Sequence, residues 1–173
     1  AWHRDKLKYH LSVHSNSEAD LVYSEGRLVN SKGEILDEYT CPAPKKSGRP
    51  LMRQLFLEGG AVILSLSSVT VTTEAWNETD GFSDGYLVSA DLDFYIQLSE
   101  HFQFKRLPRT LLNKRIHCRN QSDDYEQIYD DHRRMLEKFK NNYAFIDSEY
   151  ENKKIARMEY RLATSALSAG DPT

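Results

Sequence analysis

The sequence has little cysteine, little net charge and no long apolar run. Its two cysteines, Cys41 and Cys118, are too few for a disulfide framework and fit reduced thiols, which predicts a cytoplasmic protein. A formal net charge of -3, with scattered lysine and arginine, gives no electrostatic basis for binding nucleic acid. No apolar segment reaches the length of a membrane span, and the first residues lack the apolar region of a signal peptide. We therefore expect no nucleic-acid partner and no transmembrane segment.

The composition that remains is that of a globular protein. A hydrophobic content of 39% and a charged content of 28% are typical values, and 173 residues can bury one substantial core. Local patterns predict helices over 5–14, 51–57 and 74–78, and strands over 21–30, 34–36, 61–73, 104–107 and 111–116, with Pro108 separating the last two. This alternation indicates an α/β fold.

The pattern becomes helical after residue 122. Apolar and aromatic residues recur at i, i+3 and i+4 over 125–143, and Asp123 and Asp124 suit the N-terminal dipole of a helix there. A second helix is expected over 147–166. We therefore expect a domain of residues 1–122 followed by a helical extension, residues 123–173. The aromatic stripe of 125–143 is expected to pack between helices; docking of another domain or a second subunit is the alternative.

The stretch SADLDFYIQLSEHF, residues 89–102, carries two aspartates at the start of an apolar run. Read with a period of two, it is a half-buried strand with Asp91 and Asp93 both in water. Read at helical spacing, Asp91 lies inside a wide apolar stripe, whereas Asp93 lies on the opposite side and points to solvent or a structural hydrogen bond. The two periods therefore give the aspartates different environments.

Five segments resemble, in order, motifs of glycosyltransferase family 2, nucleotide-sugar-dependent enzymes with the GT-A fold. AWHRDKL resembles the helix after the acidic metal-binding motif, and ADLVYSEGRLVNSKGEIL resembles the following strand and turn. SSVTVTTEAWNETDGFSD, SADLDFYIQL and LLNKRIHCRNQS resemble the later G-F-D/E loop, the E-D-x-D-L helix and the closing Y-R-x-H-x-x-x-S stretch. The resemblance covers residues 1–122 and implies part of a GT-A-like mixed sheet.

The resemblance implies that Asp91 begins a helix and acts as the catalytic base. Inverting transfer needs a carboxylate that takes the proton of the acceptor hydroxyl as its oxygen attacks the anomeric carbon. A helix N-terminus favours the charged form of such a carboxylate. The alternative is that Asp91 only supports the helix dipole as a first-turn acid.

The resemblance also implies residues near the donor. His117 matches a histidine that approaches the divalent metal or the diphosphate, and Arg115 alternates onto the same strand face. These cations would offset the charge that grows on a leaving diphosphate. Ser122 is a third candidate for donor binding. The alternative for His117 and Arg115 is an edge strand with surface partners.

The resemblance implies Mg²⁺ or Mn²⁺ as cofactor, held mainly by an Asp-x-Asp motif expected upstream of Ala1. The chain would then be the acceptor-side half of an inverting glycosyltransferase, inactive alone, that uses a nucleotide-sugar donor and a carbohydrate or lipid-linked acceptor. Two positions depart from the pattern: Ala90 replaces the usual Glu, and Gln97 a common Arg. These departures leave open a second reading, a non-catalytic binding or assembly module, which could form a homo-oligomer through its helical tail.

One tempting metal pattern is set aside. His10 and His14 stand at i, i+4 on the predicted first helix, a spacing that can hold zinc. No acidic or cysteine partner lies near them in the sequence. We expect an ordinary helix surface there.

Overall fold

The computed structural model of the chain describes residues 1–57, 62–116 and 124–168. In this part of the chain, four strands form a mixed open sheet, accompanied by six α-helices, which confirms the α/β class. The chain divides into two compact units: unit 1 comprises Ala1–Gly81 and Phe94–Cys118, and unit 2 comprises Phe82–Asp93 and Arg119–Thr173. The boundary expected after residue 122, and the GT-A likeness, stay predictions.

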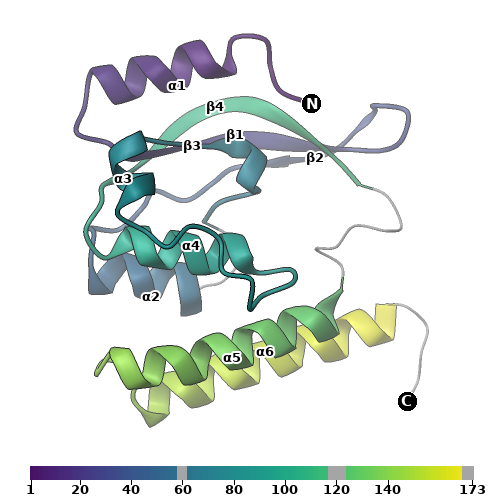
Figure 1. Cartoon of the computed structure of the whole chain (residues 1–173). Coiled ribbons are helices and arrows are strands. Elements are labelled where there is room, and N and C mark those ends of the chain that lie inside the picture. Colours follow the sequence, from purple (N-terminus) through teal and green to yellow (C-terminus); the bar gives the residue numbers. More distant parts are fainter. Residues whose placement is uncertain (58–61, 117–123, 169–173) are drawn as a thin grey trace. The chain divides into compact units, whose positions relative to one another are not determined.

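Strand β1 (Leu21–Val29) is the centre of the sheet in unit 1 (Figure 1). It pairs antiparallel with β2 (Ile35–Tyr39) through its C-terminal half and with β3 (Val69–Val71) through its N-terminal half. It pairs parallel with β4 (Phe104–Arg115) over its whole length. Leu21, Val22 and Tyr23 are fully buried, so this strand carries both faces of the sheet core.

Strand β4 runs through Pro108 without a break, so the prediction of two separate strands is wrong. Ser24 pairs with Leu107 and Glu25 pairs with Thr110, which leaves Pro108 inside a register shift. Proline cannot donate to the ladder, and a bulge removes the need for that donor.

The predicted strand over 61–73 is wrong for most of its length. Over the described residues 62–73, the regular structure that precedes α3 is one 3₁₀ turn, η1 (Leu66–Ser68), and the three residues of β3. Serine side chains compete for the local backbone: Ser65 accepts from the Ser67 amide, and Ser68 donates to the Ser65 carbonyl over 2.6 Å. Local hydrogen bonds thus replace ladder bonds in this serine-rich segment.

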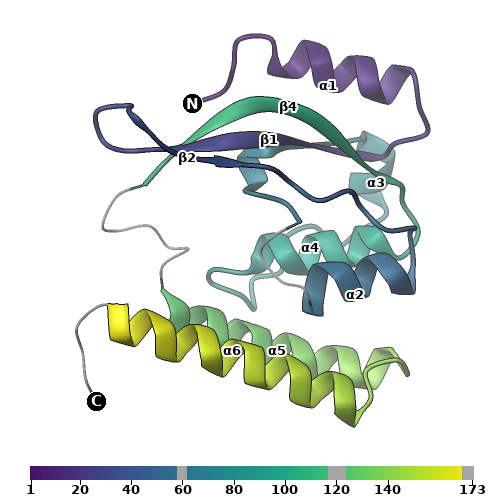
Figure 2. The ribbon, with the colours of Figure 1, turned by 180° about the vertical axis from the view of Figure 1, so that it is seen from behind.

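The helices predicted for unit 1 are present and lie on both faces of the sheet. They are α1 (Lys6–Ser15), α2 (Arg49–Leu57), α3 (Thr73–Asn77) and α4 (Ala90–Ser99), the last of which begins in unit 2. Helix α1 crosses one face, while α2 and the C-terminal part of α4 lie on the other (Figures 1 and 2). Residues 94–99 of α4 are buried except for Gln97, which explains the nearly continuous apolar run.

The histidines of α1 face the sheet, so the expected ordinary helix surface is wrong. His10 is fully buried, and its Nδ1 lies 2.9 Å from Thr70 Oγ1. His14 donates from Nδ1 to the Ala19 carbonyl over 2.8 Å, and its Nε2 lies 2.9 Å from the same Thr70 Oγ1. The i, i+4 spacing therefore brings both histidine rings to the hydroxyl of Thr70 in β3.

Unit 2 contains the predicted helical hairpin. Helix α5 (Tyr125–Asn142) and helix α6 (Ser148–Ser168) lie side by side in opposite directions (Figures 1 and 2). Asp124 caps α5 by accepting from the Gln127 amide over 3.0 Å. The buried apolar side chains of the hairpin are Met135, Leu136, Phe139, Ile146, Tyr150 and Met158. Among the described residues, no helix combines the length and apolar character that a membrane span requires.

Candidate functional site

The helical reading of residues 89–102 is confirmed, and the strand reading is excluded. Helix α4 starts at Ala90, and the Ser89 carbonyl accepts from the amides of Leu92 and Asp93 over 3.1 and 3.2 Å. Asp91 and Asp93 both lie in its first turn, where the helix dipole stabilises negative charge. The local sequence thus places two carboxylates at one helix N-terminus.

The two aspartates have opposite environments. Asp91 is half-buried, whereas Asp93 is fully buried and accepts from Lys138 Nζ over 3.1 Å. Solvent and a structural hydrogen bond were the two alternatives expected for Asp93, and the structure confirms the hydrogen bond. The reason is α5, which supplies Lys138 and covers this side of the first turn within unit 2. Asp93 therefore has a structural role, and Asp91 is the first-turn acid that retains contact with water.

Lys138 also interacts with two aromatic rings. Its Nζ lies 6.0 Å from the ring centroid of Tyr86 and 5.7 Å from that of Phe139. Burial raises the pKa of the Tyr86 phenol, and the nearby carboxylate of Asp93 raises it further. Tyr86 is therefore neutral at physiological pH, and the aromatic rings favour the cation that pairs with Asp93.

A third carboxylate, Asp131 of α5, holds the segment that leads into α4. It is fully buried, and it accepts from the amides of Leu87, Val88 and Ser89 over 3.3, 2.8 and 2.9 Å. Two side chains add to this set: Gln127 Nε2 donates over 3.0 Å and an Arg134 nitrogen over 2.7 Å. The buried charge is thus compensated by five donors.

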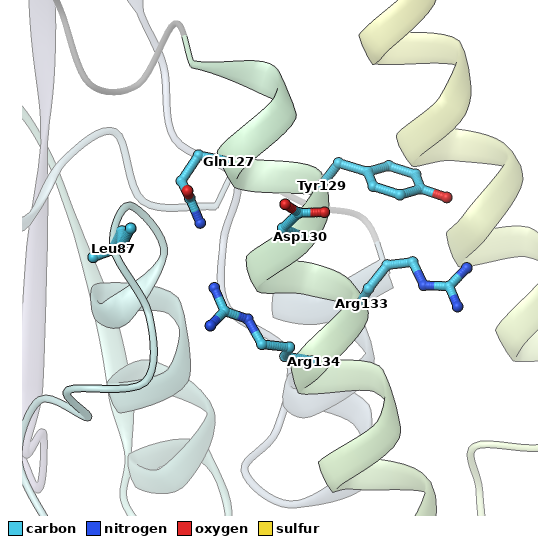
Figure 3. Close-up of a pocket in the computed structure, with 6 residues that line it drawn as sticks. All are labelled: Leu87, Gln127, Tyr129, Asp130, Arg133 and Arg134. Carbon is cyan, nitrogen blue, oxygen red and sulfur yellow. The ribbon is translucent and has the colours of Figure 1, made fainter.

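An open hollow of about 550 Å³ lies on unit 2 (Figure 3). Its lining combines one apolar side chain with amide, phenol, carboxylate and guanidinium groups, from Leu87, Gln127, Tyr129, Asp130, Arg133 and Arg134. Gln127 and Arg134 extend toward Leu87, whereas Tyr129 and Arg133 extend toward α6 (Figure 3). Interaction with Tyr129 raises the pKa of Arg133, so this guanidinium is permanently charged. Such groups can donate to and accept from a polar, hydroxyl-bearing ligand.

The other predicted site residues are only partly covered by the structure. Arg115 is the last residue of β4 in unit 1, where it is exposed and pairs in register with Val29. His117 and Ser122 lie outside the described residues. The sites expected to hold Mg²⁺ or Mn²⁺, upstream of Ala1 and at His117, likewise lie outside them. Within the described ranges, no cluster of three or more His, Cys, Asp or Glu side chains could hold a metal ion.

Of the two positions that depart from the family pattern, Gln97 has a structural task in unit 1. Its Oε1 accepts from the Asp80 amide over 3.2 Å, and its Nε2 donates to the Gly81 carbonyl over 3.5 Å. A glutamine can make both bonds because its amide has one donor end and one acceptor end. Ala90, the other departure, is the first residue of α4.

Sequence reasoning missed Asp131 and Lys138, although the sequence held a signal for the first. Asp131 stands three residues after Ile128 and four before Met135, which places it on the apolar stripe of α5. An acid on such a stripe needs buried donors. Lys138 has no comparable signal, because an exposed lysine on a helix is ordinary.

Comparison with known proteins does not extend this description: no protein-family model matches the chain, and no curated protein matches it.

Proposed function

We propose that the chain is the acceptor-side half of an inverting glycosyltransferase in which Asp91 is the general base. The observation that carries this proposal is the contrast between the two first-turn carboxylates. Asp93 is buried and paired with Lys138, whereas Asp91 is half-buried at the same helix N-terminus. A base must reach its substrate and stay ionised: Asp91 is only half-buried, and the N-terminal dipole of α4 favours its charged form.

In the proposed reaction, Asp91 takes the proton of the acceptor hydroxyl while the oxygen attacks the anomeric carbon of the donor. The bond from that carbon to the diphosphate oxygen breaks, and its electron pair leaves with the nucleoside diphosphate. The configuration at the anomeric carbon inverts because attack and departure occur on opposite faces. Arg115, His117 and Ser122 remain the proposed groups at the donor diphosphate, with His117 also proposed toward Mg²⁺ or Mn²⁺.

We place the acceptor, a carbohydrate or the sugar of a lipid-linked acceptor, at the hollow shown in Figure 3. Leu87 in its lining lies four residues before Asp91, in the segment that leads into α4. The guanidinium of Arg133 and the carboxylate of Asp130 offer a donor and an acceptor to sugar hydroxyls. The acceptor would thus be held on the same unit as the base.

The test compares D91N with D84N in protein expressed from the complete gene. Both variants remove one carboxylate from the segment 82–93, but Asp84 is exposed and lies before the helix. Release of nucleoside diphosphate is measured with a panel of UDP-, GDP- and dTDP-sugars and simple glycoside acceptors. D91N should lower kcat by roughly 10²- to 10⁴-fold, the usual contribution of a general base, and D84N should leave it unchanged. Transfer by D91N at the parent rate would show that Asp91 is not the base.

A second comparison tests the acceptor site. R133A removes a guanidinium from the lining of the hollow, and K153A removes an exposed cation of α6 that pairs with Glu149 one turn away. R133A should raise the KM for the acceptor several-fold with little change in kcat, because it acts on binding. K153A should behave like the parent. If both variants have the same KM and kcat, the acceptor does not bind in this hollow.

The second candidate function is a non-catalytic assembly module. It is favoured by two large apolar side chains that α6 exposes: Tyr160 is 70% exposed and Leu167 is 73% exposed, and seven residues separate them on one helix face. If the protein self-associates through this face, replacing both residues by lysine should lower its apparent molecular mass in size-exclusion chromatography. Absence of transfer with every donor, together with such a shift, would favour assembly over catalysis.

A further inference from the structure

The carboxylate of Asp131 binds three consecutive backbone amides. Its Oδ2 accepts from Val88 and Ser89 over 2.8 and 2.9 Å, and its Oδ1 accepts from Leu87 over 3.3 Å. The donors lie 42 to 44 residues away in the sequence, so this is a tertiary contact between α5 and the segment before α4. One side chain therefore fixes three successive peptide groups.

The charge of Asp131 is compensated where it lies. Burial alone raises the pKa of this carboxyl, but the hydrogen bonds from Val88, Ser89, Gln127 and Leu87 together hold it below its ordinary value. Asp131 is therefore ionised throughout the physiological range. A buried anion with this many donors constrains the groups that donate to it.

The constrained segment is continuous with the start of α4. The amide of Ser89 donates to Asp131, while the carbonyl of Ser89 accepts from the amides of Leu92 and Asp93. Asp91 lies between the residues so bonded, within the same helical turn. The direction in which the first turn leaves the loop is thus set by the bond to Asp131.

We propose that Asp131 is a positioning residue that anchors residues 87–89 and thereby places Asp91 for proton transfer. The inference rests on the proposed function, because it gives Asp131 a purpose only if Asp91 is the base. Asp131 would not touch the substrate: it acts through the loop and the helix start. The effect of replacing Asp131 can therefore be measured separately from the effect of replacing Asp91.

The central variant is D131N, with R134A as its matched control. An asparagine has one acceptor oxygen and one NH₂ donor, so it cannot accept from both the Leu87 side and the Val88–Ser89 side. R134A instead removes the ion pair at 2.7 Å and leaves the three backbone donors on the carboxylate. Both variants change the charge around the same atom, but only D131N breaks the anchor.

Amide hydrogen exchange measures the anchor without any catalytic assay. In D131N, exchange at residues 87–89 should become at least about 10-fold faster, while α5 and α6 keep the protection of the parent. R134A should keep slow exchange at 87–89. Faster exchange across all of α5 and α6 in D131N would overturn the proposal, because it would mean general loss of stability, as would unchanged exchange at 87–89.

Kinetics measure the positioning. D131N should lower kcat by about 10- to 100-fold, as expected for a displaced reacting group, with a smaller change in KM and with the acid limb of the pH profile unmoved. Because Arg134 lines the proposed acceptor site, the kinetic control is D147N, which changes an exposed carboxylate of unit 2 that accepts from the Tyr150 amide over 2.8 Å. D147N should stay within about 3-fold of the parent on both constants. Parent kcat in D131N, when D91N is inactive, overturns this inference alone. Parent kcat in D91N overturns the proposed function, and the purpose given to Asp131 falls with it.

Discussion

Lys138 Nζ donates to Asp93 Oδ1 across 3.1 Å, and this bond joins α5 to the first turn of α4 within unit 2. The pair is asymmetric: the Asp93 side chain is fully buried, and that of Lys138 is 44% exposed. The carboxylate is desolvated by the fold, while water still reaches the ammonium. Replacing Lys138 should therefore lower the free energy of unfolding mainly because the buried carboxylate of Asp93 loses this ion pair.

The variant K138M should destabilise the protein by about 2 kcal/mol, less than the 3–5 kcal/mol of a fully buried pair, because water screens the exposed lysine. Urea unfolding monitored by circular dichroism measures the change in the free energy of unfolding. The double variant D93N/K138M should recover part of the loss, since it removes the buried charge as well. Additive effects of the two substitutions would mean that the pair is not coupled.

Replacement of Lys154 should stabilise the protein near neutral pH. Burial, then Arg161 and Arg157, lowers the pKa of Lys154 to about 7. Because the unfolded chain binds the proton more tightly, stability rises as pH increases from 7 toward the ordinary value of 10.5. At pH 7, K154M should raise the free energy of unfolding by about 1–4 kcal/mol, the range found when buried ion pairs are replaced by well-packed apolar groups.

The control for this change is the neighbouring lysine of α6. Lys153 is 62% exposed and pairs with Glu149 one turn away. K153M should alter the free energy of unfolding by less than about 0.5 kcal/mol. A loss of stability in K154M at pH 7 would show that the ammonium is well compensated in the folded protein.

The buried His10 should make folding sensitive to mild acid. Burial, then the charges of Lys6 and His14, lowers its pKa to about 4 from the ordinary 6.5. A histidine kept neutral in the fold contributes stability that is complete above pH 6.5 and is lost as pH falls toward 4. The loss should reach about 3 kcal/mol at pH 4, since one pKa unit corresponds to about 1.4 kcal/mol.

Thermal unfolding between pH 4 and pH 7 tests this prediction. H10L removes one of the titrating groups and should reduce the pH dependence over this range, while the buried His132, whose pKa is lowered to about 3, keeps its own contribution. The exposed His101 provides a control, and H101L should retain the parent slope. If the slope is the same in H10L and the parent, other groups account for the acid sensitivity.

Gly26 in β1 should tolerate no side chain. A Cβ built there would lie 2.5 Å from Leu64 Cδ2 and 2.8 Å from the Leu112 carbonyl oxygen, and this oxygen belongs to the backbone of β4. G26A should therefore destabilise unit 1 by about 1–3 kcal/mol, the usual cost of overpacking a core.

Gly85 gives the matched comparison. Among the residues that the structure describes, a Cβ there meets Ser83 Oγ, at an ordinary contact distance of 3.5 Å. G85A should be neutral or slightly stabilising, by up to about 1 kcal/mol, because alanine restricts the unfolded chain. Equal midpoints of urea unfolding for G26A and G85A would mean that β1 and β4 can separate without cost.

The sequence by itself determined the elements whose signals are local. The apolar stripe of 125–143 predicted α5. Residues 89–102 fitted both a strand and a helix, and the structure selects the helix, with Asp91 in its first turn. Such signals act over three or four residues, the distance of one helical turn. The Asp-x-Asp motif, the donor and the roles of Arg115 and His117 rest on resemblance and stay predictions.

The tertiary structure decided which carboxylates are buried and which groups they bind. Asp93 is buried by a partner 45 residues away, and Asp131 holds Ser89 across 42 residues. No local period encodes either contact, because a side chain's period fixes its face and not what covers that face. The same reason explains β4, where pairing with β1 carried the strand through Pro108 although the local sequence predicted a break.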